Sequence, residues 1–396
     1  MKKSLLLMAF YDGTWAGGIY YTRNVAFMLT QNDYIAINFD IYIYTYSEYT
    51  REYDDIKGVK LLIAQRSSGL CSRVFRKIAR FLTLRKFDYI YPISSRILSS
   101  QAISWIPDFQ HNHCPEFFSD EELRKRTRRF TRIAKSKAPL ILSSYDALSD
   151  FQKYYPPKRN VYVMPFISYL EPLIRRISSE QEKNILQRFE LLNTKYVCIM
   201  NQFWQHKNHK VVLEAIHQLA FAFKSYNPSD SLATSTSTSS TSSMPSDLCF
   251  VFTGRMDDYR NSAYIDELQK IFNDPLTAQH TKLLGFIDRE EQIIVMKNAQ
   301  FIIQPSLFEG WGTVVEDAKV LDKTILLSDI PVHREQINEK CILFDPHNSH
   351  ALAELILEES KKEHRDNIEK GCVNMYTHAK EYSKSFERLL RDCEEL

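Results

Sequence analysis

Short apolar runs rich in β-branched and aromatic residues alternate with helical patterns along the whole chain. Such runs are typical of buried strands, and strands that alternate with helices form parallel sheets covered on both faces. The strands expected in the first half are 4–10, 35–44, 59–63, 89–93, 102–107, 140–144 and 161–166. Those expected in the second half are 196–201, 248–254, 282–286, 301–305, 324–328 and 341–344. The pattern predicts an α/β protein with two doubly wound domains, whose ligands bind at the carboxyl ends of the strands.

The alternation is interrupted near 167–182, where Pro172 and the polar segment SSEQEK occur. We therefore expect a first Rossmann-like domain at 1–170 and a second at 171–377. The C-terminal segment, about 378–396, has the pattern of an amphipathic helix that could pack back on the first domain.

Residues 229–246 form an insertion in which thirteen of eighteen residues are Ser or Thr. Such a composition cannot bury enough apolar surface to order itself. We therefore predict a disordered insertion in the second domain and assign it no chemistry.

Charge is distributed unevenly, although the chain of 396 residues has a net charge of only +2. Residues 1–170 contain 25 Lys and Arg against 15 Asp and Glu, whereas residues 171–396 contain 26 against 34. The first half is thus expected to face an anionic partner, or the two halves to attract each other.

Two basic helical segments account for much of this charge, at 71–86 and 121–137. Either could lie on anionic lipid, and either could equally be a core-facing helix with a solvated basic face. Nucleic acid is a weaker candidate, because no recognised binding module accompanies the charge.

The seven cysteines are scattered and show neither disulfide nor zinc spacing, which suits a reducing compartment. The apolar stretch at the N-terminus is too short for a signal peptide, and no apolar run is long enough to cross a bilayer. The expected location is therefore the cytoplasm, with a peripheral position on the inner face of the plasma membrane left open.

The segment PSLFEGWGTVVEDA (305–318) follows an expected strand and leads into a helical pattern, with Glu309 in the loop beside Gly310 and Gly312. A strand that enters a helix through a glycine-containing turn presents unpaired N–H groups and the helix dipole to an anion. Phosphate would repel a neighbouring carboxylate, so Glu309 is expected to accept hydrogen bonds from neutral hydroxyls. Phosphate and hydroxyls side by side indicate a nucleotide sugar.

The segment NQFWQHKNHKVVLEAI (201–216) repeats the pattern of strand, loop and helix. Lys207 lies just before the helix, where its ammonium and the helix amides could hold one diphosphate. Taken alone, Lys207 is more simply a solvated lysine. A second anion-binding turn at 309–313 in the same predicted domain favours the functional interpretation.

In the first domain, YDGTWAGGIYYTRN (11–24) places Gly17 and Gly18 before a helix. Glycine there allows a ligand phosphate to approach the backbone closely, although the spacing is not that of a dinucleotide fingerprint.

The segment SWIPDFQHNHCPEFFS (104–119) places His111 in a loop after a strand. There His111 could donate a proton or stabilise charge, or it could merely cap backbone groups. No carboxylate spacing near His111 and His113 supports a metal site.

Taken together, five segments resemble family-4 glycosyltransferases of the GT-B fold, in particular bacterial members that build cell-surface polysaccharides. The segments are WIPDFQH (105–111), NQFWQHKNHK (201–210), FTGRMDDYRN (252–261), LLGFIDREEQI (283–293) and PSLFEGWGTVVEDAK with LLSDIPVHREQ (305–336). The resemblance implies two Rossmann-like domains facing across a cleft. It also implies transfer of a sugar, with retention and without a metal or other cofactor, from a nucleotide-sugar donor to a saccharide or lipid-linked acceptor. The donor would bind mainly to the second domain and the acceptor to the first.

The resemblance further implies roles for single residues. Glu309 matches the first Glu of the family's two-Glu motif, Lys207 matches its phosphate-binding Lys, and His111 its first-domain His near the donor sugar. The second Glu is replaced by Asp317, and the usual Arg before the Lys by Gln202. The donor-binding residues implied in this way are Gly17, Gly18, Gln202, Gly254, Arg255, Phe286, Gly310, Trp311, Gly312, Thr313, Glu316 and Asp317.

Two alternatives stay open at this point. A nucleotide-sugar epimerase on the same fold would need an acid/base set that the sequence does not reveal. A catalytically decayed scaffold that only binds sugar nucleotides is suggested by Gln202 and Asp317, whereas Glu309, Lys207 and His111 together argue against it.

Overall fold

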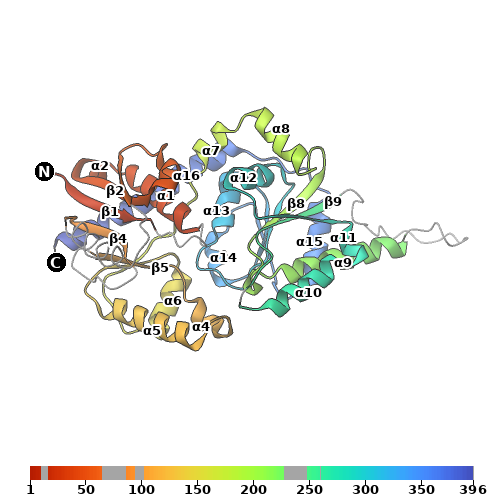
Figure 1. Ribbon diagram of the computed structural model, residues 1–396, viewed down its shortest axis with the longest axis horizontal. Helices are drawn as coiled ribbons and strands as arrows, with labels where there is room; N and C mark the ends of the chain where they lie inside the picture. Colours follow the sequence, from red (N-terminus) through yellow and green to blue (C-terminus); the bar gives the residue numbers. More distant parts are fainter. Residues whose placement is uncertain (10–16, 65–85, 94–101, 227–247, 259, 396) are drawn as a thin grey trace, which may run out of the picture. The chain divides into compact units, whose positions relative to one another are not determined.

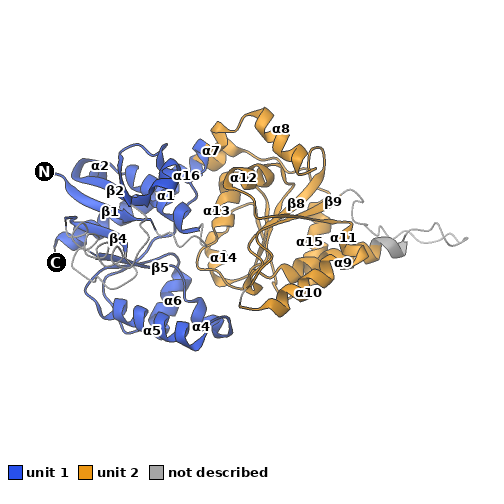
Figure 2. Ribbon diagram, viewed as in Figure 1, with its two compact units in different colours: residues 1–172, 373–396 blue, residues 173–372 orange. Residues whose placement is uncertain are grey.

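A computed structural model describes residues 1–9, 17–64, 86–93, 102–226, 248–258 and 260–395 (Figure 1). The chain forms two compact units, Met1–Pro172 with Val373–Leu396, and Leu173–Cys372 (Figure 2). The insertion expected at 229–246 lies outside the described residues, as does all of the basic segment 71–86 except Lys86.

The first unit is built around a parallel sheet of seven strands in the order β3-β2-β1-β4-β5-β6-β7. The apolar runs form these strands because strands of a parallel sheet bury apolar side chains, as in β1, where Leu5, Leu6 and Leu7 are fully buried. The edge strands β3 and β7 are only partly buried. The strands are β1 (Lys3–Met8), β2 (Phe39–Tyr46), β3 (Val59–Ala64), β4 (Tyr89–Ile93), β5 (Ala102–Ile106), β6 (Leu140–Leu142) and β7 (Val161–Val163).

The helices of the first unit include α16, which begins at Ile368 and returns to this unit at the end of the chain. In α16 the ring of Phe386 packs edge-on against Tyr91 of β4, with ring centroids 5.5 Å apart. The helical segments are α1 (Gly17–Thr30), α2 (Asp33–Asn38), η1 (Ser47–Tyr53), α4 (Gln110–His113), η2 (Pro115–Phe117), α5 (Asp120–Lys135), α6 (Tyr145–Tyr154), α16 (Ile368–Glu394) and, at the boundary of the units, α7 (Glu171–Arg176).

The strand expected at 35–44 is wrong in its first residues. Residues Asp33–Asn38 form the short helix α2, and β2 begins only at Phe39. The reason is a local cap: the side chain of Asn32 accepts the N–H of Ile35 at 3.0 Å, which starts a helix where the apolar pattern alone favours a strand.

The second unit contains a parallel sheet of six strands in the order β10-β9-β8-β11-β12-β13. The strands are β8 (Lys195–Met200), β9 (Leu248–Thr253), β10 (Thr281–Gly285), β11 (Ile302–Gln304), β12 (Ile325–Ser328) and β13 (Cys341–Phe344). The helices are α8 (Ser179–Arg188), η3 (Gln205–Lys207), α9 (His209–Tyr226), α10 (Ser262–Phe272), α11 (Pro275–Ala278), α12 (Arg289–Asn298), α13 (Thr313–Val320), α14 (Pro331–Gln336) and α15 (Ser349–Glu359). Among the described residues, no helix is both long and apolar enough to span a membrane.

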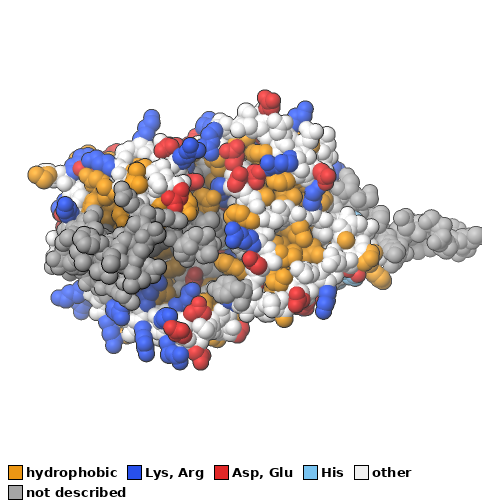
Figure 3. Space-filling model, in the orientation of Figure 1, with side chains coloured by type: hydrophobic (Ala, Val, Ile, Leu, Met, Phe, Trp, Pro, Cys, Tyr) orange, Lys and Arg blue, Asp and Glu red, His pale blue; other side chains and the backbone are white. Residues whose placement is uncertain are grey.

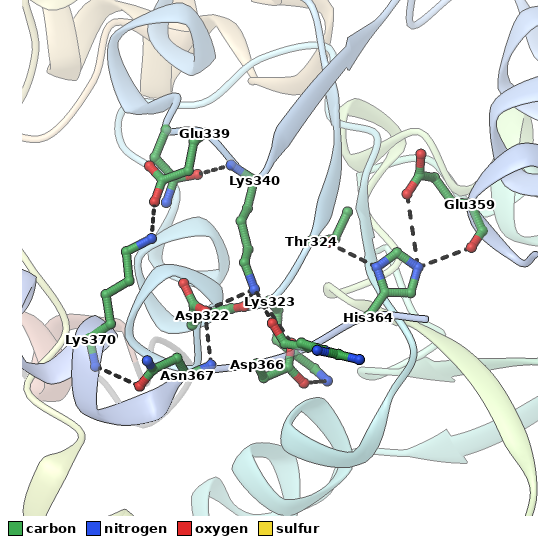
Figure 4. A network of polar contacts seen from close by, with 12 residues as sticks. Asp322, Lys323, Thr324, Glu339, Lys340, Glu359, His364, Asp366, Asn367 and Lys370 are labelled. Atoms are coloured by element: carbon green, nitrogen blue, oxygen red, sulfur yellow. Dashed lines mark hydrogen bonds and ion pairs between the residues drawn. The ribbon is translucent and has the colours of Figure 1, made fainter. Parts of the chain in front are cut away.

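A polar network fixes the segment between α15 and α16 on the second unit (Figure 4). The buried ammonium of Lys323 lies 2.6 Å from Asp366 Oδ2, and Lys340 Nζ lies 2.8 Å from Asp322 Oδ2. Asp322 Oδ2 also accepts the backbone N–H of Asn367 at 2.9 Å. The start of α16 is thereby anchored beside the start of β12.

Candidate active site

The strands β8 and β11 are neighbours in the second sheet, and the strand order changes direction between them. Loops that leave the carboxyl ends of two such strands open a crevice, which is where doubly wound α/β proteins bind ligands. A hydrogen bond joins the two loops, since the N–H of Leu307 donates to the carbonyl of His206 at 2.8 Å. The loops therefore carry Lys207 and Glu309 to the same place.

Lys207 and Glu309 form an ion pair in which Lys207 Nζ lies 2.6 Å from Glu309 Oε1. Ser306 Oγ and Gln304 Nε2 also donate to Oε1, at 2.7 and 2.9 Å. Within the described part of the chain, no group donates to Oε2. The described chain therefore leaves Oε2 of Glu309 without a donor, although the side chain is only 9% exposed.

The Glu309 carboxylate is held in its charged form. Burial alone would raise the pKa of Glu309, but the neighbouring Lys207 ammonium, with smaller contributions from His333 and His206, lowers it to about 2. The side chain is thus an ionised acceptor at any physiological pH.

The glycine turn at the start of α13 is clamped by Gln336 of α14. Gln336 Oε1 accepts the N–H of Gly312 at 3.0 Å, while its Nε2 donates to the Gly312 carbonyl at 3.1 Å and to Glu316 Oε1 at 2.8 Å. A Cβ at position 312 would lie 3.1 Å from Gln336 Oε1 and 3.0 Å from a methyl of Val315, so a side chain there would require both neighbours to shift. The N–H of Gly312 is therefore already engaged.

The first free amide of α13 belongs to Thr313. In the described chain no group accepts its N–H, so this amide and the helix dipole are available to an anion. Gly310, Trp311 and Thr313 are all partly exposed around the turn.

A second group beside the Lys207–Glu309 pair is His333 of α14, which is fully buried. Its Nδ1 lies 2.9 Å from the carbonyl oxygen of Ser328 and 3.0 Å from Ser328 Oγ. A carbonyl only accepts, so Nδ1 carries the proton and Nε2 carries the lone pair. Nε2 is buried and has no hydrogen-bond partner among the described residues.

The loops after β8, β9 and β10 bring four predicted residues together. Arg255 N–H donates to Gln202 Oε1 at 2.9 Å, and Gly254 N–H donates to the carbonyl of Gly285 at 2.8 Å. A side chain at position 254 is excluded, since its Cβ would lie 2.2 Å from the Asn201 carbonyl and the φ angle is +119°. The exposed ring of Phe286 lies under the Arg255 guanidinium, 5.0 Å from its carbon. This exposed ring offers a flat surface on which a base could stack.

Asp317 and Glu316 both lie on α13 and are buried. Arg289 makes a bidentate contact with Asp317, with both nitrogen-to-oxygen distances at 2.6 Å. Glu316 Oε1 accepts from Gln336, as above, and from Lys319 at 3.1 Å. Protein groups thus engage both carboxylates that the sequence assigns to donor binding.

In the first unit, the predicted residues lie at the ends of different strands. Gly17 and Gly18 begin α1 after β1. His111 lies in α4 after β5 and is almost fully buried, with Nε2 3.0 Å from Tyr155 Oη and its ring edge-on to Phe130. Burial, with the positive charges of Arg126 and His113, lowers the pKa of His111 to about 4, so the ring is neutral.

Sequence reasoning missed Gln304, Ser306, His333, Gln336 and Arg289. Gln304 left a signal, because it is a polar residue inside an apolar strand, and such a residue must find a partner. The other four carry no pattern of their own. Among the described residues, no three His, Cys, Asp or Glu side chains cluster as metal ligands.

The family model for glycosyl transferases group 1 matches residues 180–381, just over half of the chain. The chain belongs to the group 1 glycosyltransferases. The match contains Lys207, Glu309 and the whole of the sheet on which they lie. No curated protein matches this group 1 glycosyltransferase in sequence.

Solved structures confirm the GT-B fold of this group 1 glycosyltransferase. HepE of Anabaena, in complex with UDP and glucose, is 12% identical with a TM-score of 0.64, and each chain is covered in full. A glycosyltransferase from Rickettsia africae is 13% identical with a TM-score of 0.62, covering 100% of this chain and 98% of the other. WaaG, a glycosyltransferase involved in lipopolysaccharide biosynthesis, is 11% identical with a TM-score of 0.58, covering 96% and 95%.

Proposed function

We propose that this glycosyltransferase is a retaining, metal-independent enzyme that moves a sugar from a nucleotide-sugar donor to a saccharide or lipid-linked saccharide. The observation that carries the proposal is the Lys207–Glu309 pair at the switch point of the second sheet. One ammonium at a helix N-terminus and one ionised carboxylate with a spare oxygen suit the two halves of such a donor, its diphosphate and its sugar hydroxyls.

The main chemical requirement is to stabilise the negative charge that develops on the departing nucleoside diphosphate. Lys207 and the Thr313 amide would stabilise that charge electrostatically. Glu309 Oε2 would accept from a sugar hydroxyl and orient the anomeric carbon. Retention would follow from attack by the acceptor hydroxyl on the face that the leaving group vacates, with the hydroxyl proton passing to the departing diphosphate oxygen.

The nucleotide itself would lie across the loops after β8, β9 and β10, with its base on Phe286. HepE structures in complex with UDP and with UDP-glucose support a nucleotide-sugar donor for this fold. The Arg289–Asp317 contact modifies the expected ribose site, because a ribose hydroxyl must share the Asp317 carboxylate with a guanidinium. His111 would line the acceptor side of the sugar, and the backbone at Gly17 and Gly18 would approach the donor phosphates.

We also propose a lipid-linked acceptor at an anionic membrane surface, as in assembly of a cell-surface polysaccharide. Lys and Arg side chains gather along α5 (Figure 3), where Arg124, Arg128 and Arg132 are exposed. None of these three has an ion-pair partner in the described part of the chain. A row of unpaired cations is attracted to anionic headgroups.

The proposal is tested by a thermal-shift screen of the purified protein against UDP-, GDP-, ADP- and dTDP-sugars. At about a hundred times the dissociation constant, a ligand should add about 2.7 kcal/mol of stability. We expect a shift with one nucleotide class, which is lost in Glu309→Ala and Lys207→Ala.

Turnover then separates the remaining alternatives. A transferase releases nucleoside diphosphate when an acceptor is present, an epimerase changes the sugar without an acceptor, and a scaffold does neither. Failure of every donor class to shift the protein would count against nucleotide-sugar binding, and therefore against both the enzyme and a scaffold that binds sugar nucleotides.

A further inference from the structure

The Nε2 atom of His333 is a buried acceptor that the fold leaves without a partner. The rest of the ring is fixed, since Nδ1–H donates to Ser328 O at 2.9 Å and Ser328 Oγ in turn donates to Ser306 O at 2.6 Å. Ser306 is the same residue that donates to Glu309 Oε1. One chain of hydrogen bonds therefore sets the positions of both the imidazole and the carboxylate.

The ring also lies within electrostatic range of the ion pair. Burial is the main cause that lowers the pKa of His333. The charge of Glu309 raises this pKa, and the charge of Lys207 lowers it. The imidazole is consequently neutral near pH 7, with a lone pair on Nε2. A buried lone pair without a donor is costly, so its retention beside a binding site points to a donor supplied by a ligand.

We propose that His333 Nε2 accepts a hydrogen bond from one hydroxyl of the transferred sugar, which makes His333 a determinant of donor-sugar specificity. This inference rests on the proposed function and adds a residue to the sugar subsite. If Lys207 turns from Glu309 toward the diphosphate when a donor binds, the space beside Glu309 would become available to the sugar. Glu309 Oε2 and His333 Nε2 are then two acceptors for two hydroxyls.

Two substitutions separate this role from a structural one. His333→Asn keeps an N–H where Nδ1 was, and so keeps the bond to Ser328, but has no atom at the Nε2 position. His333→Gln places its amide near the Nε2 position and loses the bond to Ser328. A purely structural histidine tolerates Asn better than Gln, and a sugar-binding histidine tolerates Gln better than Asn. Arg334→Gln, on the exposed neighbour, is the control and should leave activity unchanged.

The experiment measures kcat/KM for the donor with a set of monodeoxy forms of its sugar. We expect His333→Asn to lose about 10- to 100-fold with the natural donor, the effect of one unpaired buried polar group. We expect one deoxy position to penalise the unmodified protein but not His333→Asn, because both changes remove the same hydrogen bond. Binding of the matching nucleoside diphosphate, which lacks the sugar, should be unchanged.

Two results would overturn the inference. If every deoxy position costs the same in His333→Asn as in the unmodified protein, His333 contacts no sugar hydroxyl, while the proposed function stands. If the unmodified protein neither binds nor turns over any nucleotide sugar, the proposed function and this inference fall together.

Discussion

The ammonium of Lys207 donates to Glu309 Oε1 at 2.6 Å, so the group expected to hold phosphate neutralises the group expected to hold sugar. A diphosphate that takes the ammonium must leave the buried carboxylate without its counter-charge. Sugar hydroxyls that donate to Glu309 would replace the lost hydrogen bond. Under the proposed function, the pair would thus link recognition of the two halves of a donor.

Removal of the Lys207 ammonium should lower turnover about 100-fold or more, as for other preorganised groups that stabilise charge in the transition state. The measurement is release of nucleoside diphosphate by Lys207→Met in the presence of acceptor. Lys210→Met is the matched control, because Lys210 lies one residue into α9, is partly exposed and pairs with Glu267. Near-normal transfer by Lys207→Met would exclude the assigned role.

For the Lys207–Glu309 pair, we also expect that a second substitution can restore stability without restoring activity. Lys207→Met leaves the Glu309 charge buried and unpaired, which should cost about 3 kcal/mol. Lys207→Met/Glu309→Gln removes that charge and should regain most of the loss in urea unfolding, while remaining inactive. The pKa of Glu309 is depressed to about 2, so the stability from its ionised form is complete above about pH 4.3 and lost only as pH falls toward 2. Unfolding at pH 7 therefore reports the full effect, and additive losses would show that the pair is not coupled.

Phe286 should contribute to nucleotide binding through its exposed ring. Phe286→Ala should weaken binding of the nucleoside diphosphate about tenfold, since stacking of a base on an aromatic side chain contributes about 1–3 kcal/mol. Titration calorimetry gives the dissociation constant directly. Phe221→Ala removes another exposed phenylalanine, on α9, and should leave binding unchanged. Equal effects of the two substitutions would show that no base stacks on Phe286.

The sequence was sufficient to predict the two sheets and the position of Lys207 and Glu309, for a physical reason. Apolar runs show which residues form strands, and strand order then fixes where the loops after β8 and β11 meet. The contacts made by His333, Gln336 and Arg289 could not be predicted from the sequence. Each depends on the rotation of a short helix or the reach of one side chain, which apolar periodicity does not encode. Similarly, the cap at Asn32 replaced the beginning of an expected strand with a helix, because one side-chain hydrogen bond outweighed the local pattern.

The pKa values of His111 and His113 should be shifted in opposite directions, although only one residue separates the two histidines. Asp150 Oδ2, 2.7 Å from His113 Nε2, raises the pKa of His113, whereas burial lowers that of His111 to about 4. Imidazole nitrogen shifts of histidine-labelled protein at pH 5.5 should show a charged His113 and a neutral His111. Titration of His111 near its ordinary value would contradict its burial.

The His113 pair also gives stability a defined pH dependence. Because the pKa of His113 is raised in the folded state, its contribution is complete below the unfolded value of about 6.5 and is lost as pH rises through the folded value. The difference in stability between the unmodified protein and Asp150→Asn should accordingly be larger at pH 6 than at pH 9. A difference independent of pH would show that the pair contributes no charge interaction.

The basic side of α5 should bind anionic membranes, and the strength of binding should depend on position as well as on total charge. Each Lys or Arg near such a surface contributes about 1 kcal/mol, so Arg124→Gln/Arg128→Gln/Arg132→Gln should weaken binding to phosphatidylglycerol-containing vesicles about 100-fold. Vesicle sedimentation measures the partition coefficient, and added salt should reduce it, because the contact is electrostatic and exposed.

Lys183→Gln/Lys195→Gln/Lys270→Gln removes the same charge from exposed positions of the second unit and should have little effect. If both triple variants lose binding equally, attraction is due to net charge alone. If the unmodified protein does not sediment with anionic vesicles, α5 is a helix with a solvated basic face, and the lipid-linked acceptor loses its support from this surface.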